Sequence, residues 1–161
     1  MPDKPKAVPE GTQSITAHLS VRGAEQAIKF YQQAFGAQPM FVHKMPDGKV
    51  MHASLKIGNS TLMLADEFPG SPHPAPRDGT PVVLNLYVED VDTVWNRAVD
   101  AGAKVSMPLA NQFWGDRYGQ IVDPFGHSWA LLSHVEDVPR EEMERRANAF
   151  FADMNKKPAG A

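Results

Sequence analysis

Apolar and polar residues alternate along two separate stretches of the chain, and this two-residue period predicts a β-strand in each. In the first stretch, Ser14–Val21, the apolar residues are Ile15, Ala17, Leu19 and Val21. The second stretch is "VVLNLYV", Val82–Val88. Each strand is followed by apolar residues at helical spacing, in "AEQAIKFYQQAFG" and "VDTVWNRAVDAG", and each of these segments ends in a glycine suited to a helix C-cap.

Three further strand-like runs follow each predicted helix. In the first half they are Pro39–Lys44, Val50–Ile57 and Thr61–Ala65, and in the second half Lys104–Met107, Arg117–Val122 and His127–Ser133. Landmark residues recur at nearly constant separation, as in the pairs Gly36 and Gly102, His18 and Asn85, and Gly58 and Gly126. A strand–helix–three-strand unit therefore occurs twice, which predicts an α+β fold of two tandem βαβββ modules.

The segments outside the two units have a different composition. The stretch "EFPGSPHPAPRDGTP" is rich in proline and predicts an extended connector. Beyond the second unit, Pro139 suits the first turn of a helix whose apolar side carries Met143, Phe150 and Phe151. The predicted organisation is a flexible arm at 1–13, a first module at 14–67, a Pro-rich linker at 68–80, a second module at 81–135, a C-terminal helix at 136–154 and a flexible tail at 155–161.

Composition narrows the chemistry. The chain has 161 residues, a formal net charge of −3 and no cysteine, so disulfides, thiolate nucleophiles and cysteine metal sites are excluded. The chain has no long run of like charges, which would indicate a nucleic acid partner or an anionic membrane. No apolar run is long enough to span a bilayer and no signal peptide is visible, so we expect a cytoplasmic protein without a membrane partner.

Three strings carry a family resemblance. They are "VRGAEQAIKFYQQAFGA", "PDGKVMHASLKIGNSTLMLADE" and "FWGDRYGQIVDPFGHSWALLSHVEDV". Together with the repeated unit, they resemble the PhnB-like branch of the vicinal oxygen chelate superfamily, which includes glyoxalases, bleomycin resistance proteins and extradiol dioxygenases. The resemblance covers about residues 14–145. It implies that the two modules form a cup-shaped mixed sheet with the helices packed outside.

The resemblance also implies where a metal would bind. Metal-using members place ligands at four equivalent cup-facing positions, which the landmarks align with His18, Leu62, Asn85 and Ala130. His18 is a good ligand, Asn85 is a weak oxygen donor, and the other two offer no donor atom. We therefore predict no metal and no cofactor, with a divalent metal bound at a non-standard site as the alternative.

Strand parity extends the predicted site. If His18 faces the cup, Ile15, Leu19 and Val21 pack beneath the helix, and the same period places other residues on the cup side. His18 and His52 are the candidates for acid–base chemistry, while Trp114 either stacks on a ligand or packs a seam. The predicted ligand-binding residues are His18, His52, Ser54, Leu62, Asn85, Tyr87, Trp114, Tyr118, Gln120, Ala130 and Leu132.

A cup lined by both polar and apolar side chains is typical of a pocket for a small organic molecule. The first hypothesis is a binding protein that lacks the usual metal site. The alternative is a metal-dependent lyase or isomerase of glyoxalase type, or a dioxygenase, that uses His18. A metal-independent enzyme using His18 or His52 remains open. Because each module makes half a cup and the last helix is apolar on one side, we expect a homodimer.

Overall fold

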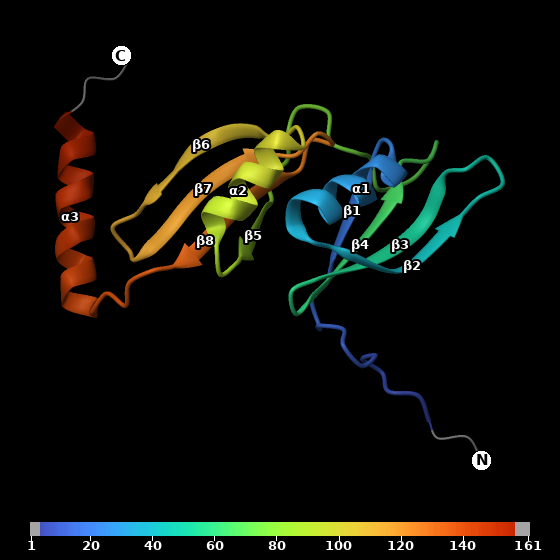
Figure 1. Cartoon of the computed structure of the whole chain (residues 1–161), viewed down its shortest axis with the longest axis horizontal. Coiled ribbons are helices and arrows are strands. Elements are labelled where there is room, and N and C mark those ends of the chain that lie inside the picture. Colours follow the sequence, from blue (N-terminus) through green and yellow to red (C-terminus); the bar gives the residue numbers. More distant parts are fainter. Residues whose placement is uncertain (1–3, 157–161) are drawn as a thin grey trace.

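Residues 4–156 are described by a computed structural model, which confirms two tandem βαβββ modules followed by a C-terminal helix (Figure 1). The strands of the first module form a mixed sheet in the order β1-β4-β3-β2, in which β1 and β4 are parallel and the other neighbours antiparallel. Its elements are β1 (Ala17–Val21), α1 (Ala24–Phe35), β2 (Gln38–Lys44), β3 (Val50–Ile57) and β4 (Ser60–Asp66).

The second module repeats this topology, with strand order β5-β8-β7-β6 and a parallel β5–β8 pair. Its elements are β5 (Val83–Tyr87), α2 (Val91–Asp100), β6 (Lys104–Asn111), β7 (Asp116–Val122) and β8 (Ser128–His134). The last helix, α3, spans Arg140–Lys156, so it begins and ends later than predicted. Residues 1–3 of the predicted arm and 157–161 of the predicted tail lie outside the described residues.

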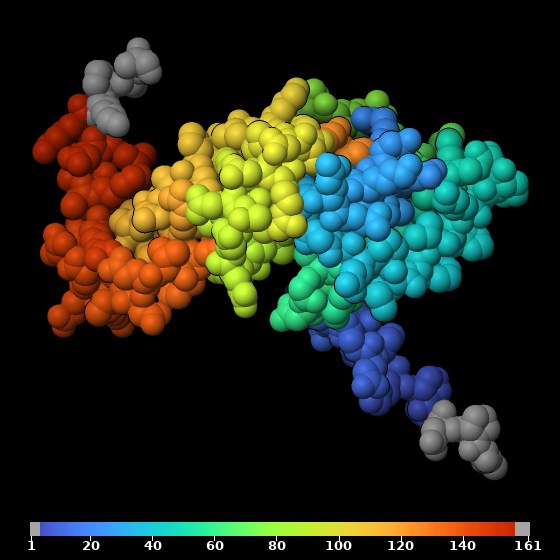
Figure 2. All heavy atoms as spheres, viewed as in Figure 1, coloured from blue at the N-terminus to red at the C-terminus, as the bar shows by residue number. Residues whose placement is uncertain are grey.

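One hydrophobic core joins the two modules. Helix α1 packs against α2, and the aromatic rings of α1 meet those of the second module. The ring of Phe35 lies 4.8 Å from that of Trp129, and Phe30 lies 6.2 Å from Phe125. The space-filling view shows the first module, in blue and cyan, meeting the second, in yellow, along the two helices (Figure 2).

The core decides which way each sheet faces. Leu19, Val21 and Leu64 of the first sheet share the core with Ile121 and Leu131 of the second. The opposite faces of both sheets, which carry His18 and Asn85, therefore turn away from this core. Ile15 precedes β1 and is 92% exposed, so the prediction that it packs beneath the helix is wrong.

Helix α3 stands apart from both modules, at the end of the molecule near β6 (Figure 1). None of its described side chains is buried. The guanidinium of Arg146 holds it to the second module through hydrogen bonds to the carboxylate of Glu136 and the carbonyl oxygen of Phe113, and Phe150 packs 5.1 Å from the Phe113 ring. In the part of the chain described, no helix has the length and hydropathy needed to cross a bilayer.

Candidate functional site

The outward face of the first sheet carries both predicted acid–base histidines. In the strand register, His18 of β1 lies opposite Met63 of β4, and Met63 in turn lies opposite Ser54 of β3. The rings of His18 and His52 are stacked, with centroids 5.9 Å apart. The structure therefore brings His18, His52 and Ser54 together on one face, as parity predicts.

Leu62 does not belong to this face, so its predicted place in the cup is wrong. It lies opposite Ala17 and Leu55, is 5% exposed, and forms part of the hydrophobic core. Met63 takes the cup-side position instead. The error comes from aligning Gly58 with Gly126, because the turn between β3 and β4 is shorter than the connection between β7 and β8. A shift of one residue moves a strand side chain to the opposite face.

A third histidine joins the pair from outside the sheet. The ring of His73, in the Pro-rich linker, lies 6.4 Å from that of His18. Partial burial and the positive charges that His52 and His73 carry when protonated lower the pKa of His18 below its ordinary value. Sequence reasoning missed His73 because it lies in a connector with no periodic pattern that would show which way its side chain points.

The linker holds His73 in place, because it is fastened to the first module. The guanidinium of Arg22 donates to the carbonyl oxygen of Pro76 at 3.0 Å, and the amide of Ala75 donates to the Glu67 carboxylate at 3.2 Å. Ala75 is buried. Gly126 of the second module, with a φ of +92°, approaches so closely that a Cβ there would come within 2.9 Å of Pro76.

The corresponding face of the second sheet is more closely packed. Ala130 lies between Asn85 and Gln120 in the register and is fully buried, while Leu132 lies opposite Tyr118. The side-chain amide of Gln120 donates to the Tyr118 hydroxyl oxygen at 2.7 Å. Tyr87 on β5 is exposed, whereas Ala130 and Leu132, which were predicted to line the cup, are buried in the single chain.

Trp114 lies at one end of this surface, in the turn before β7. Its indole N–H donates to the carboxylate of Asp116 at 2.9 Å, and its ring packs edge-on against that of Tyr118 at 5.6 Å. Asp116 also bonds His134, which contacts Asp137 with its other ring nitrogen. The hydrogen bonds to Asp116 and Asp137 raise the pKa of His134 above its ordinary value. Trp114 thus belongs to a packed polar cluster beside α3.

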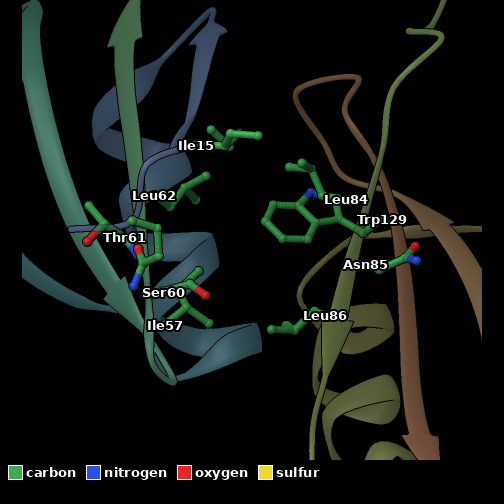
Figure 3. Close-up of a pocket in the computed structure, with 11 residues that line it drawn as sticks. Ile15, Ile57, Ser60, Thr61, Leu62, Leu84, Asn85, Leu86 and Trp129 are labelled. Atoms are coloured by element: carbon green, nitrogen blue, oxygen red, sulfur yellow. The ribbon is translucent and has the colours of Figure 1, made fainter. Parts of the chain in front are cut away.

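A separate cavity of about 260 Å³ lies between the modules, on the core side of the two sheets. Figure 3 shows Leu62 and Ile57 of the first module pointing toward Trp129, Leu84 and Leu86 of the second, while Asn85 points away from them. Leu62 therefore lines an apolar gap between modules, and within one chain the faces with His18 and Asn85 lie on opposite sides of it.

The donor set at the four equivalent positions does not fit the superfamily's metal site. With the corrected register these positions hold His18, Met63, Asn85 and Ala130. A divalent transition metal requires several imidazole or carboxylate donors, and His18 alone supplies one of these. Nor do any three His, Asp or Glu side chains within residues 4–156 have the arrangement needed to hold a metal ion.

Comparison with known proteins identifies the family. Residues 13–131 match the sequence profile of the Glyoxalase/Bleomycin resistance protein/Dioxygenase superfamily. The chain belongs to this superfamily. Within it, the chain is 43% identical over 136 residues to the protein Rv0887c of Mycobacterium tuberculosis, a match that covers 81% of this chain and 80% of that protein.

Solved structures of other proteins share the fold. TioX from Micromonospora sp. ML1 is 25% identical with a TM-score of 0.61, and the match covers 76% of this chain and 99% of TioX. A PhnB protein from Bacillus cereus is 24% identical with a TM-score of 0.58, covering 75% of this chain and 99% of that protein. At this identity the second match shows the fold alone.

Proposed function

We propose that this superfamily member binds a small organic molecule against the outward face of its first sheet, without the usual metal site. The observation that carries the proposal is the make-up of that face. The imidazoles of His18 and His52, the hydroxyl of Ser54 and the ring of Phe41, 6.3 Å from that of His52, gather on one open surface. Such a combination of aromatic surface and a few polar groups suits a small organic ligand.

The donor set supports the part of the proposal that concerns metal. Met63 and Ala130 stand where metal-using relatives need ligands, and neither offers an imidazole or carboxylate. The alternative activity, a metal-dependent lyase, isomerase or dioxygenase using His18, needs its other ligands from elsewhere. A binding function requires no such addition, and His18 and His52 remain available to a ligand as hydrogen-bonding groups.

We also propose that two chains associate as a homodimer, so that the first-module face of one chain meets the second-module face of the other. Two features of the chain support this arrangement. The two faces open in opposite directions, so a single chain leaves both half-cups open. In addition, β1 and β5 are edge strands of the described sheets, and Val83 and Tyr87 on β5 are exposed apolar residues.

The test first finds a ligand and then blocks the outward face of the first sheet with a bulky side chain. Small aromatic and acidic compounds are screened by thermal shift in EDTA, and the affinity of each hit is measured by calorimetry for wild type and Met63→Trp. We expect binding to persist in EDTA and to be lost in Met63→Trp, because the indole fills the space between His18 and Ser54. Val99→Trp, on the surface of α2, is the control and should bind like wild type. Equal affinity in Met63→Trp and wild type would refute the assignment of this face.

A further inference from the structure

Three imidazoles converge from segments that are far apart in the sequence. His18 belongs to β1, His52 to β3 and His73 to the linker, and the ring of His18 lies 5.9 Å from that of His52 and 6.4 Å from that of His73. In the described part of the chain, the ion pairs that involve histidine all belong to His134, so no carboxylate pairs with these three rings. The imidazoles therefore offer hydrogen-bond donors that are not already occupied by acidic side chains.

The cluster has open space beside it. A cavity of about 350 Å³ is lined by His18, Ser20 and His73. Ser20 adds a hydroxyl on the same strand face as His18, and its carbonyl oxygen accepts a hydrogen bond from the His127 ring at 2.9 Å, which ties this strand to the second module. Because the linker is fastened through Ala75 and Pro76, His73 faces this cavity from a supported backbone.

Two kinds of ligand bind several imidazoles at once. Imidazole nitrogens that share one Zn²⁺ ion each lie about 2.0–2.1 Å from it, so they are at most about 4.2 Å apart. Nitrogens that donate to one negatively charged oxygen each lie about 2.7–2.9 Å from it, and they lie farther apart again when they reach different oxygens of one group. Within residues 4–156 no three His, Asp or Glu side chains have the arrangement needed to hold a metal ion, so the three neighbouring rings favour an oxyanion over a metal.

We propose that His18, His52 and His73 bind an oxyanion group, such as a carboxylate or phosphate, with the rest of the molecule in the adjoining cavity. This inference rests on the proposed ligand-binding function and names the class of its ligand. The histidines donate N–H groups to the oxyanion, and the Ser20 hydroxyl supplies a further donor beside them. Three of the six histidines in the chain meet in this cluster, although they come from separate segments.

The test uses inorganic phosphate and acetate as probes on the full chain without a histidine tag. Histidine ring resonances are followed by NMR at about pH 6.5, where imidazole is partly protonated, with chloride at equal ionic strength as the reference. We expect the signals of His18 and His73 to shift together and saturate, both in EDTA and without it. Losing one charge-assisted hydrogen bond in His73→Gln or His52→Gln should weaken phosphate binding by about tenfold.

His43→Gln is the matched control, because His43 lies on the same sheet but outside the three-ring cluster. It should leave phosphate affinity within about twofold of wild type, the range expected of an exposed charge. Equal weakening in His43→Gln and His73→Gln, or no saturable shift at His18, overturns the proposal. If organic ligands bind this face but phosphate and acetate neither bind nor compete, the oxyanion site fails while the proposed function stands.

Discussion

The hydroxyl of Tyr31 on α1 donates a hydrogen bond to the carboxylate of Asp123, which lies 92 residues later in the second module. The same carboxylate accepts from the Trp129 indole and from the backbone amides of Phe125 and His127. Burial, together with the nearby charge of Asp123, raises the pKa of Tyr31 well above its ordinary value. A single buried acidic group is thus satisfied from both modules, and its bonds hold the modules in a fixed orientation.

Tyr31→Phe tests this link. The substitution removes one donor from a buried carboxylate and keeps the ring, so we expect a loss of about 1–3 kcal/mol of unfolding free energy in urea. Tyr87→Phe is the control, because Tyr87 is 63% exposed and its loss of a hydroxyl should cost almost nothing. Equal stability of Tyr31→Phe and wild type would show that Asp123 is satisfied without the first module.

Leu62 and Met63 are neighbours that the structure places on opposite faces of β4. Alanine substitutions at the two positions should therefore have different effects. Leu62→Ala leaves a cavity in the core and should cost about 2–5 kcal/mol in urea unfolding. Met63→Ala should cost much less and should instead reduce the affinity of a ligand bound beside His18. A large loss of stability in Met63→Ala together with a loss of ligand affinity in Leu62→Ala would mean that Leu62, and not Met63, faces the ligand.

The sequence predicted most of the architecture because its signals were local and repeated. The two-residue period placed His18 and His52 on one face and Leu19 and Val21 in the core. Gly36 caps α1 as predicted, whereas the C-cap of α2 is Ala101 and not Gly102. Ile15 lies before the first residue of β1, so the strand period did not hold there, and two further errors arose where the turns and the linker set the geometry. The unequal turns displaced Leu62 by one position, and no sequence pattern linked His73 to β1, because folding of the linker brings them together.

The titration of His18 gives a further prediction. Partial burial, followed by the charges of His52 and His73, lowers the pKa of His18, so the ring stays neutral to lower pH than a free imidazole. Its protonation consequently reduces stability as pH falls below the unfolded value of about 6.5. In NMR titrations, His52→Gln and His73→Gln should each move the pKa of His18 upward, toward that value. An unchanged midpoint in both variants would mean that the rings are not neighbours in solution.

The proposed dimer is tested by light scattering at micromolar concentration. We expect the full chain to have the mass of two copies, with α3 contributing through Phe150 and Phe151, which are exposed in the single chain. A truncated chain that ends at Val138 should dissociate at a higher protein concentration than the full chain does. A monomeric full chain would contradict the dimer, whereas an equally stable truncated dimer would remove α3 from the contact.

The central claim is ligand binding without the superfamily's usual metal site, and its most direct test is elemental analysis of protein purified without a histidine tag. Because Met63 and Ala130 occupy two of the four ligand positions, we predict far less than one zinc, nickel, manganese or iron per chain. For the same reason, His18→Ala should change neither metal content nor thermal stability in EDTA. One tightly bound transition metal per chain in wild type, lost in His18→Ala, would contradict the account.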